Sequence, residues 1–194
     1  MSAGDPRWQL EPAGGGTRVF AFAISLLLPI GITLGAVNHA FGDALPHAGG
    51  NGAMTAWLTV AGVSLVSLAI WWVLLRALRR HRIVLADGAI DIATSFYRRR
   101  LAIPELRLDE ARAIDLDERT EFKPMLKTNG VSMPGFRSGW FRLRNRDRAL
   151  VATAGGKRVA WIPTRAGYGL LLQPRNPQAL LDELRKMADA APRR

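Results

Sequence analysis

The sequence predicts two membrane-spanning α-helices followed by a β-rich domain of about seven strands that ends in one α-helix. Three observations lead to this fold class. Residues 19–42 contain no Asp, Glu, Lys or Arg, and a second uncharged run extends from residue 44 to residue 75. Short alternating apolar runs replace these long runs after residue 82, and an amphipathic segment follows near the end of the chain.

Each uncharged run supplies about 20 apolar residues, enough for a helix to cross a hydrocarbon core of about 30 Å. Backbone polar groups must be satisfied internally in lipid, so both spans, residues 19–37 and 53–75, are expected to be helical despite Pro29. A cleaved signal peptide is the alternative interpretation of the first span, because Arg18 precedes an apolar core. The length of the run and the poor cleavage site at residues 38–40 argue against cleavage.

Basic residues flank the two spans on one side only. Arg7 and Arg18 precede the first span, whereas the connecting loop, residues 38–52, has no Lys or Arg. Four arginines follow the second span: Arg76, Arg79, Arg80 and Arg82. Short loops rich in Lys and Arg stay in the cytoplasm, so we expect a bacterial inner-membrane protein with both termini cytoplasmic. The four arginines either contact anionic headgroups, at about 1 kcal/mol each, or only set the topology.

Gly31 and Gly35 form a GxxxG pattern in the first span. Such glycines allow two helix backbones to approach closely. They are expected to pack the first helix against the second within one chain, with a contact between two copies of the chain as the alternative.

Charge and composition restrict the chemistry. From residue 76 onward there are 25 Lys and Arg against 13 Asp and Glu, which favours contact with anionic surfaces. The chain has no cysteine, so disulfides, thiolate metal sites and cysteine nucleophiles are excluded. His39 and His47 lie in the loop between the spans without diagnostic spacing. We therefore expect no metal, no cofactor and no catalytic site.

The remainder of the chain alternates as half-buried strands do. Residues 83–86 and 89–96 predict a hairpin around Asp87-Gly88, a pair that favours a primed two-residue turn. Further strands are expected at residues 111–116, 139–144, 149–154, 158–163 and 168–173. Asn176 and Pro177 suit a helix start, and an apolar stripe follows at Leu180, Leu181, Leu184 and Met187.

Two stretches carry a resemblance to the bacterial PH-domain (pleckstrin-homology-like) membrane proteins. They are residues 128–145, TNGVSMPGFRSGWFRLRN, and residues 161–174, WIPTRAGYGLLLQP, followed by the closing helix. Gln173 stands where this resemblance would place a serine. The resemblance implies a PH-like barrel over residues 83–191, after a flexible segment (1–17) and a membrane hairpin (18–82). Eukaryotic PH domains hold phosphoinositides with a basic loop between the first two strands, and here that loop is only Asp87-Gly88.

Two groups in this domain are candidate binding sites. Arg98, Arg99 and Arg100 follow the second expected strand, where they form either a membrane or partner contact or a solvated charged edge. The loop of residues 121–139 is the candidate ligand or partner loop, in which the glycines either expose backbone amides to an anion or only permit tight turns. Its candidate residues are Lys123, Lys127, Asn129, Gly130 and Arg137.

The functional hypothesis from the sequence is a non-catalytic module for protein–protein interaction or assembly at the cytoplasmic face of the membrane, with a protein partner or self-association. Binding of anionic lipid headgroups through the basic residues is the alternative. Nucleic-acid binding would be driven by charge alone, and no specific nucleic acid is expected.

Overall fold

Two units make up the chain: residues 18–76, and residues 1–17 together with residues 77–194. The computed structural model describes residues 9–41, 50–78, 82–94 and 97–190. The predicted sites Arg79 and Arg80 lie outside these residues.

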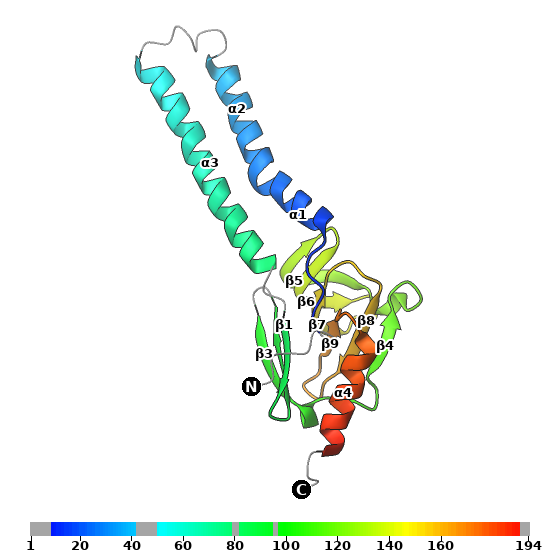
Figure 1. Cartoon of the computed structure of the whole chain (residues 1–194). Helices are drawn as coiled ribbons and strands as arrows, with labels where there is room; N and C mark the ends of the chain where they lie inside the picture. Colours follow the sequence, from blue (N-terminus) through cyan, green and yellow to red (C-terminus); the bar gives the residue numbers. More distant parts are fainter. Residues whose placement is uncertain (1–8, 42–49, 79–81, 95–96, 191–194) are drawn as a thin grey trace. The chain divides into compact units, whose positions relative to one another are not determined.

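The first unit consists of two long apolar helices (Figure 1). α1 (Gly15–Phe22), the π-helical segment η2 (Ala23–Leu27) and α2 (Leu28–Phe41) follow one another, and α3 covers Gly50–Leu78. Gly15–His39 and Met54–Arg76 are long and apolar enough to cross a membrane. Large apolar side chains such as Leu65 and Trp57 are exposed on these helices. The two helices therefore suggest a membrane location.

The π-helical segment has a local cause in Pro29. Proline has no N–H and cannot bond the carbonyl four residues earlier, at Ser25. The preceding residues adopt the wider π register, in which the Leu28 N–H donates to the Ala23 carbonyl. The rings of Phe22 and Trp71 meet edge to face at 5.3 Å, a contact between the two helices of this unit.

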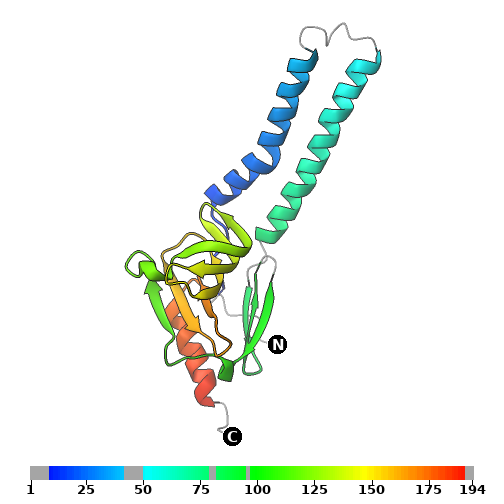
Figure 2. The same ribbon diagram turned by 180° about the vertical axis from the view of Figure 1, so that it is seen from behind.

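The second unit contains two β-sheets. The smaller has the order β1-β2-β3, formed by β1 (Arg82–Ala86), β2 (Ala89–Ala93) and β3 (Arg98–Ala102). Asp87 and Gly88 join β1 to β2 with φ of 52° and 66°. Positive φ at both positions is the primed turn that the Asp-Gly pair predicts. Figure 2 shows the small sheet (green) as a separate layer beside the larger one.

The larger sheet has six strands in the order β4-β8-β9-β7-β6-β5. They are β4 (Arg112–Asp115), β5 (Pro124–Met133), β6 (Phe136–Leu143), β7 (Arg148–Thr153), β8 (Arg158–Pro163) and β9 (Gly169–Leu172). All neighbours are antiparallel except β7 and β9. The short 3₁₀ helices η4 (Ile103–Glu105) and η5 (Thr120–Phe122) precede β4 and β5.

The β-rich domain differs from the prediction in two respects. The described residues form nine strands rather than about seven, because β3 and β5 were not expected as strands. Strand pairing between these residues also does not close a barrel, since β4 and β5 each have a single partner in the sheet. The predicted order of a β-rich region followed by a helix is confirmed.

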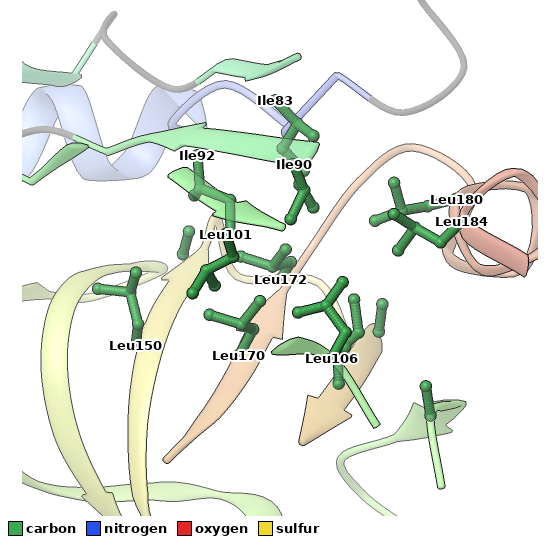
Figure 3. Close-up of a cluster of buried hydrophobic side chains, with 14 of the residues drawn as sticks. Ile83, Ile90, Ile92, Leu101, Leu106, Leu150, Leu170, Leu172, Leu180 and Leu184 are labelled. Atoms are coloured by element: carbon green, nitrogen blue, oxygen red, sulfur yellow. The ribbon is translucent and has the colours of Figure 1, made fainter. Parts of the chain in front are cut away.

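The central strands of the six-stranded sheet, β7, β8 and β9, are buried on both faces. One face packs against the small sheet and α4 (Pro177–Ala190), where Ile92, Leu101, Leu172, Leu180 and Leu184 converge (Figure 3). Asn176 caps α4 as predicted, because its Oδ1 accepts from the Ala179 N–H at 3.1 Å. The second face is lined by Phe122, Phe141 and Trp161, among others. Nearly all members of this second core belong to the sheet itself, so the sheet must curve around them.

Residues 9–17, which we name the N-terminal strap, pack on this unit. Leu10 is buried and pairs with Pro174. The Glu11 N–H donates to the Gln173 carbonyl at 3.1 Å, and the Thr17 hydroxyl donates to the Pro134 carbonyl at 2.8 Å. The strap (blue in Figure 1) thus contacts the domain along its length. A flexible segment was expected here from the sequence, and these contacts were not predicted. A buried leucine in a short polar stretch is the local reason for this difference.

Candidate functional site

The three consecutive arginines lie within β3 and not beyond the second strand. Arg98 forms a bidentate ion pair with Asp91, with a shortest distance of 2.6 Å, and Arg100 lies 3.4 Å from Asp87. The bond to Asp91 raises the pKa of the Arg98 guanidinium. Arg99 contacts the ring of Trp140 at 5.9 Å. Arg98 and Arg100 therefore have carboxylate partners, which weakens the interpretation of the whole run as a ligand site, whereas Arg99 has no ion pair between described residues.

Of the arginines after the second span, the structure describes Arg76 and Arg82. The Arg76 guanidinium lies 5.6 Å from the Trp72 ring centroid, a cation–π contact within α3. Arg82 is exposed at the first position of β1, opposite Ala93. Neither has an ion pair between described residues.

The predicted ligand loop is mostly a β-hairpin. β5 and β6 pair from Pro124 to Leu143, so Lys127, Asn129 and Gly130 are strand residues and Arg137 lies just beyond the turn on β6. Lys123 precedes β5 and binds Asp117 at 3.0 Å. The prediction of a loop failed because glycines and prolines, which commonly interrupt strands, occur here at irregular positions of a strand pair.

Gly130 has a structural explanation. It pairs with Gly139 across the hairpin, and their φ angles are 144° and 123°. A Cβ on Gly130 would overlap the carbonyl oxygen of Ser138, and one on Gly139 would overlap that of Asn129. The glycine pair allows close contact of two backbones, so the Gly130 position does not require a ligand.

Gly31 and Gly35 do not pack against α3, the other helix of this unit, as far as the structure describes it. A Cβ at either position would meet no atom within 4 Å beyond the neighbouring helix backbone. The expected close approach of the first helix to the second at these glycines is therefore wrong for the single chain. Contact between two copies of the chain stays a prediction.

A concave surface lies between the edge strand β4, the start of β8 and the N-terminus of α4. It consists of two adjoining hollows of about 530 and 300 Å³, which share Asp115, Arg158, Asn176 and Pro177. We call it the β4–α4 groove. Glu11 from the strap lines one end, while Ala113 and Gln178 line the other. β4 pairs only with β8, so it is an edge strand of the sheet, and three of its residues line the groove.

The charges of the groove are mixed. Lys157 at one side pairs with Asp117 at 2.7 Å, and Lys123 reaches the other oxygen of the same carboxylate at 3.0 Å. The bonds from Lys157 and Lys123 lower the pKa of Asp117, and Asp117 raises the pKa of Lys157. Arg158 and Arg175 have no ion pair between described residues. These two guanidiniums are therefore available for an acidic group.

Gln173 organises the strap end of the groove. Its side chain is buried, and its Oε1 accepts from the N–H groups of Ala154 and Gly156 at 2.9 and 3.0 Å. Its Nε2 donates to the carboxylate of Glu11. A serine, which the resemblance would place here, is too short to make these three bonds together. Gln173 therefore joins the β7–β8 turn to the strap.

In the described part of the chain, no three His, Asp or Glu residues lie close enough together to bind a metal ion. The groove lining contains neither Ser nor His. The expectations of no metal, no cofactor and no catalysis stay predictions.

Sequence reasoning missed the groove because its residues come from four distant segments. Arg158 and Asn176 are 18 positions apart, and Glu11 lies more than 100 positions from both. The unexpected glutamine at position 173 was the one available signal, since it marks where the strap joins the domain.

A comparison with protein families identifies the second unit. A family model described as Bacterial PH domain matches residues 81–188. No curated protein and no solved structure matches the chain.

Proposed function

Because the chain belongs to the bacterial PH domain family, we propose that it is a non-catalytic, membrane-anchored module that binds an extended protein segment in the β4–α4 groove. The segment belongs to a partner protein or to a second copy of this chain. The observation that carries the proposal is the groove itself, which is lined by residues of an edge strand that has one strand partner.

Edge strands bind extended peptides by adding a strand to the sheet. Main-chain hydrogen bonds provide affinity, and side-chain hollows beside the edge provide specificity. β4 supplies the edge here, and the side chains of α4, with Arg158, line the hollows. The guanidiniums of Arg158 and Arg175, which form no ion pair with any residue that the structure describes, favour a segment with at least one acidic side chain.

Anchoring follows from the two candidate membrane-spanning helices. The positions of the basic residues around them support insertion in a bacterial inner membrane with both termini in the cytoplasm. The groove would then face the cytoplasm and bind proteins close to the membrane.

Site-specific photocrosslinking tests the groove. The full chain, solubilised from its membrane in detergent, would carry a photoreactive residue at Gln178 or at Ala113. The control position is Arg165, which is exposed beyond the opposite end of β8. We expect a discrete adduct at the groove positions and none at Arg165.

Charge removal gives an independent test on the same preparation. The double substitution Arg158→Ser and Arg175→Ser should reduce adduct formation about tenfold or more, because two charge-assisted contacts are lost. Equal adducts at groove and control positions, or adducts that do not respond to the double substitution, would reject the groove as the binding site.

A further inference from the structure

β5 exposes two adjacent large apolar side chains. Outside the two long helices, Met125 (74% exposed) and Leu126 (59% exposed) are the only large hydrophobic residues so exposed among those that the structure describes. Successive residues of a regular strand point to opposite faces, but the pairing of β5 shifts between Pro124 and Leu126. β5 is an edge strand of the six-stranded sheet. The irregular edge therefore presents an apolar pair away from the core.

Leu126 continues into a row of arginines. It lies opposite Arg142 on β6, and Arg142 lies opposite Arg148 on β7. Cross-strand partners share one face of a sheet, and like charges directly opposite each other are destabilising. Neither arginine takes part in an ion pair between described residues. The row therefore places two exposed arginines opposite each other, with no ion-pair partner in the part of the chain that the structure describes.

Trp140 holds two guanidiniums at this place. Arg148 lies 4.4 Å from its ring centroid and Arg99 lies 5.9 Å from it. The ring itself is buried and meets Tyr168 edge to face at 5.0 Å, so its position is fixed by packing. Guanidiniums from β3 and β7 thus lie at one tryptophan, and Arg142 of β6 lies opposite Arg148 on one side and Leu126 on the other.

The chain limits how far this surface lies from the candidate spans. Ile83 follows Arg76 by seven residues, which reach about 24 Å at full extension. Arg99 lies opposite Ile92, which lies opposite Ile83, so two strand spacings add about 10 Å. Arg99 therefore stays within roughly 35 Å of the end of the second span.

We propose that Met125, Leu126, Arg99, Arg142 and Arg148 form a docking surface for the anionic lipid face of the membrane that carries the chain. The aliphatic side chains enter the interface between headgroups and acyl chains, as the apolar faces of membrane-surface helices do. The guanidiniums bind lipid phosphates and relieve the repulsion within the row. This surface differs from the β4–α4 groove, and it adds a second membrane contact to the proposed function.

Because the chain has no cysteine, one introduced cysteine reports on one position. The full chain with Leu126→Cys would be labelled with an environment-sensitive fluorophore and reconstituted in phosphatidylcholine vesicles, with or without phosphatidylglycerol. Both vesicle types contain lipids with a quencher at headgroup depth. We expect strong quenching in the anionic vesicles only. The same label at Gln178, exposed on α4, should stay unquenched.

Charge-matched variants separate the effect of the arginine row on docking from the effect of net charge. Arg142→Ser with Arg148→Ser should lower the ratio of docked to free domain about 25-fold, at about fivefold for each arginine. Arg165→Ser with Lys186→Ser removes the same charge from exposed positions elsewhere and should leave quenching unchanged. Arg142→Lys with Arg148→Lys should retain most of it. Circular dichroism of each variant checks that the fold is intact.

Three results would overturn the proposal: equal quenching in neutral and anionic vesicles, quenching that survives loss of Arg142 and Arg148, or a label that stays unquenched in both membranes. The last result would indicate that this surface binds a protein and not lipid. The groove experiment does not depend on any of them, because its positions lie on β4 and α4.

Discussion

Replacing Gln173 with alanine should detach the strap and destabilise the β-rich domain. The change removes two bonds from backbone N–H groups and one bond to the Glu11 carboxylate. A neutral hydrogen bond contributes about 0.5–1.5 kcal/mol and one to a charged group about 1.5–3 kcal/mol. Ala154, Gly156 and Glu11 are all partly accessible to water, which recovers some of the loss. We therefore expect a decrease of about 2–4 kcal/mol in the free energy of unfolding.

The assay is thermal unfolding of the full chain in detergent, followed by the circular dichroism of the β-sheets. For a domain of this size, about 3 kcal/mol lowers the unfolding midpoint by roughly 12 °C. Hydrogen exchange of residues 9–17 should accelerate in the same variant, because the strap loses its buried anchor. A midpoint within 2 °C of the wild type, about 0.5 kcal/mol, would refute the assigned role of Gln173.

Gln173→Glu offers a sharper control of the same contact. It keeps the acceptor oxygen but places a second carboxylate beside Glu11, and like charges raise the pKa of a carboxyl group. A carboxyl whose pKa is higher in the folded state binds more protons when folded, so this variant should gain stability relative to the wild type as the pH falls through that pKa. Glu11→Gln in the same chain should abolish that pH dependence.

Three further predictions concern separate parts of the chain. Gly130→Ala should lower the unfolding midpoint strongly, because its Cβ overlaps the Ser138 carbonyl, whereas Gly31→Ala should leave the midpoint unchanged; equal effects would contradict the hairpin geometry. The lowered pKa of Asp117 means that its ion pairs stabilise the fold above about pH 4 and are lost as the pH falls through that pKa, so Asp117→Asn should reduce the acid sensitivity of unfolding. Finally, a cysteine introduced at Asn38 should react with a membrane-impermeant maleimide from outside intact cells, and one at Glu118 should not; the reverse pattern would contradict cytoplasmic termini.

The fold was largely predictable because its elements are local in sequence. The two apolar runs, the Asp87-Gly88 turn and the Asn176 cap each act through neighbouring residues, and the structure contains all three. β3 and β5 were missed for opposite reasons. Three consecutive arginines hide the alternation of β3 in the sequence. In the structure the alternation is visible, because Arg98 contacts Asp91 on one face of the strand and Arg99 contacts Trp140 on the other. In β5 the glycine pair that permits close strand contact resembles a loop signal.

The candidate sites were less predictable because they depend on what lies beside each residue. Arg98 and Arg100 appear as free charges in the sequence, yet each lies beside a carboxylate of the β1–β2 hairpin. Arg142 and Arg148 were not predicted as site residues. The strand register places them opposite each other, with Leu126 opposite Arg142 on the other side. Register between strands is a tertiary property, so charge runs alone could not separate paired arginines from available ones.

The strap changes how strongly the lipid-docking surface must bind. Thr17, bonded to Pro134 at the β5–β6 turn, lies two residues before the uncharged run, and β1 begins four residues after α3 ends. The domain is therefore linked to both candidate spans, to the first through the strap and to the second through the start of β1. A short tether gives a second contact an effective concentration in the millimolar range. The docking surface can therefore bind lipid too weakly to recruit a free domain and still keep the tethered domain docked. Loss of Arg142 and Arg148 should reduce docking but leave the chain anchored by its two candidate spans.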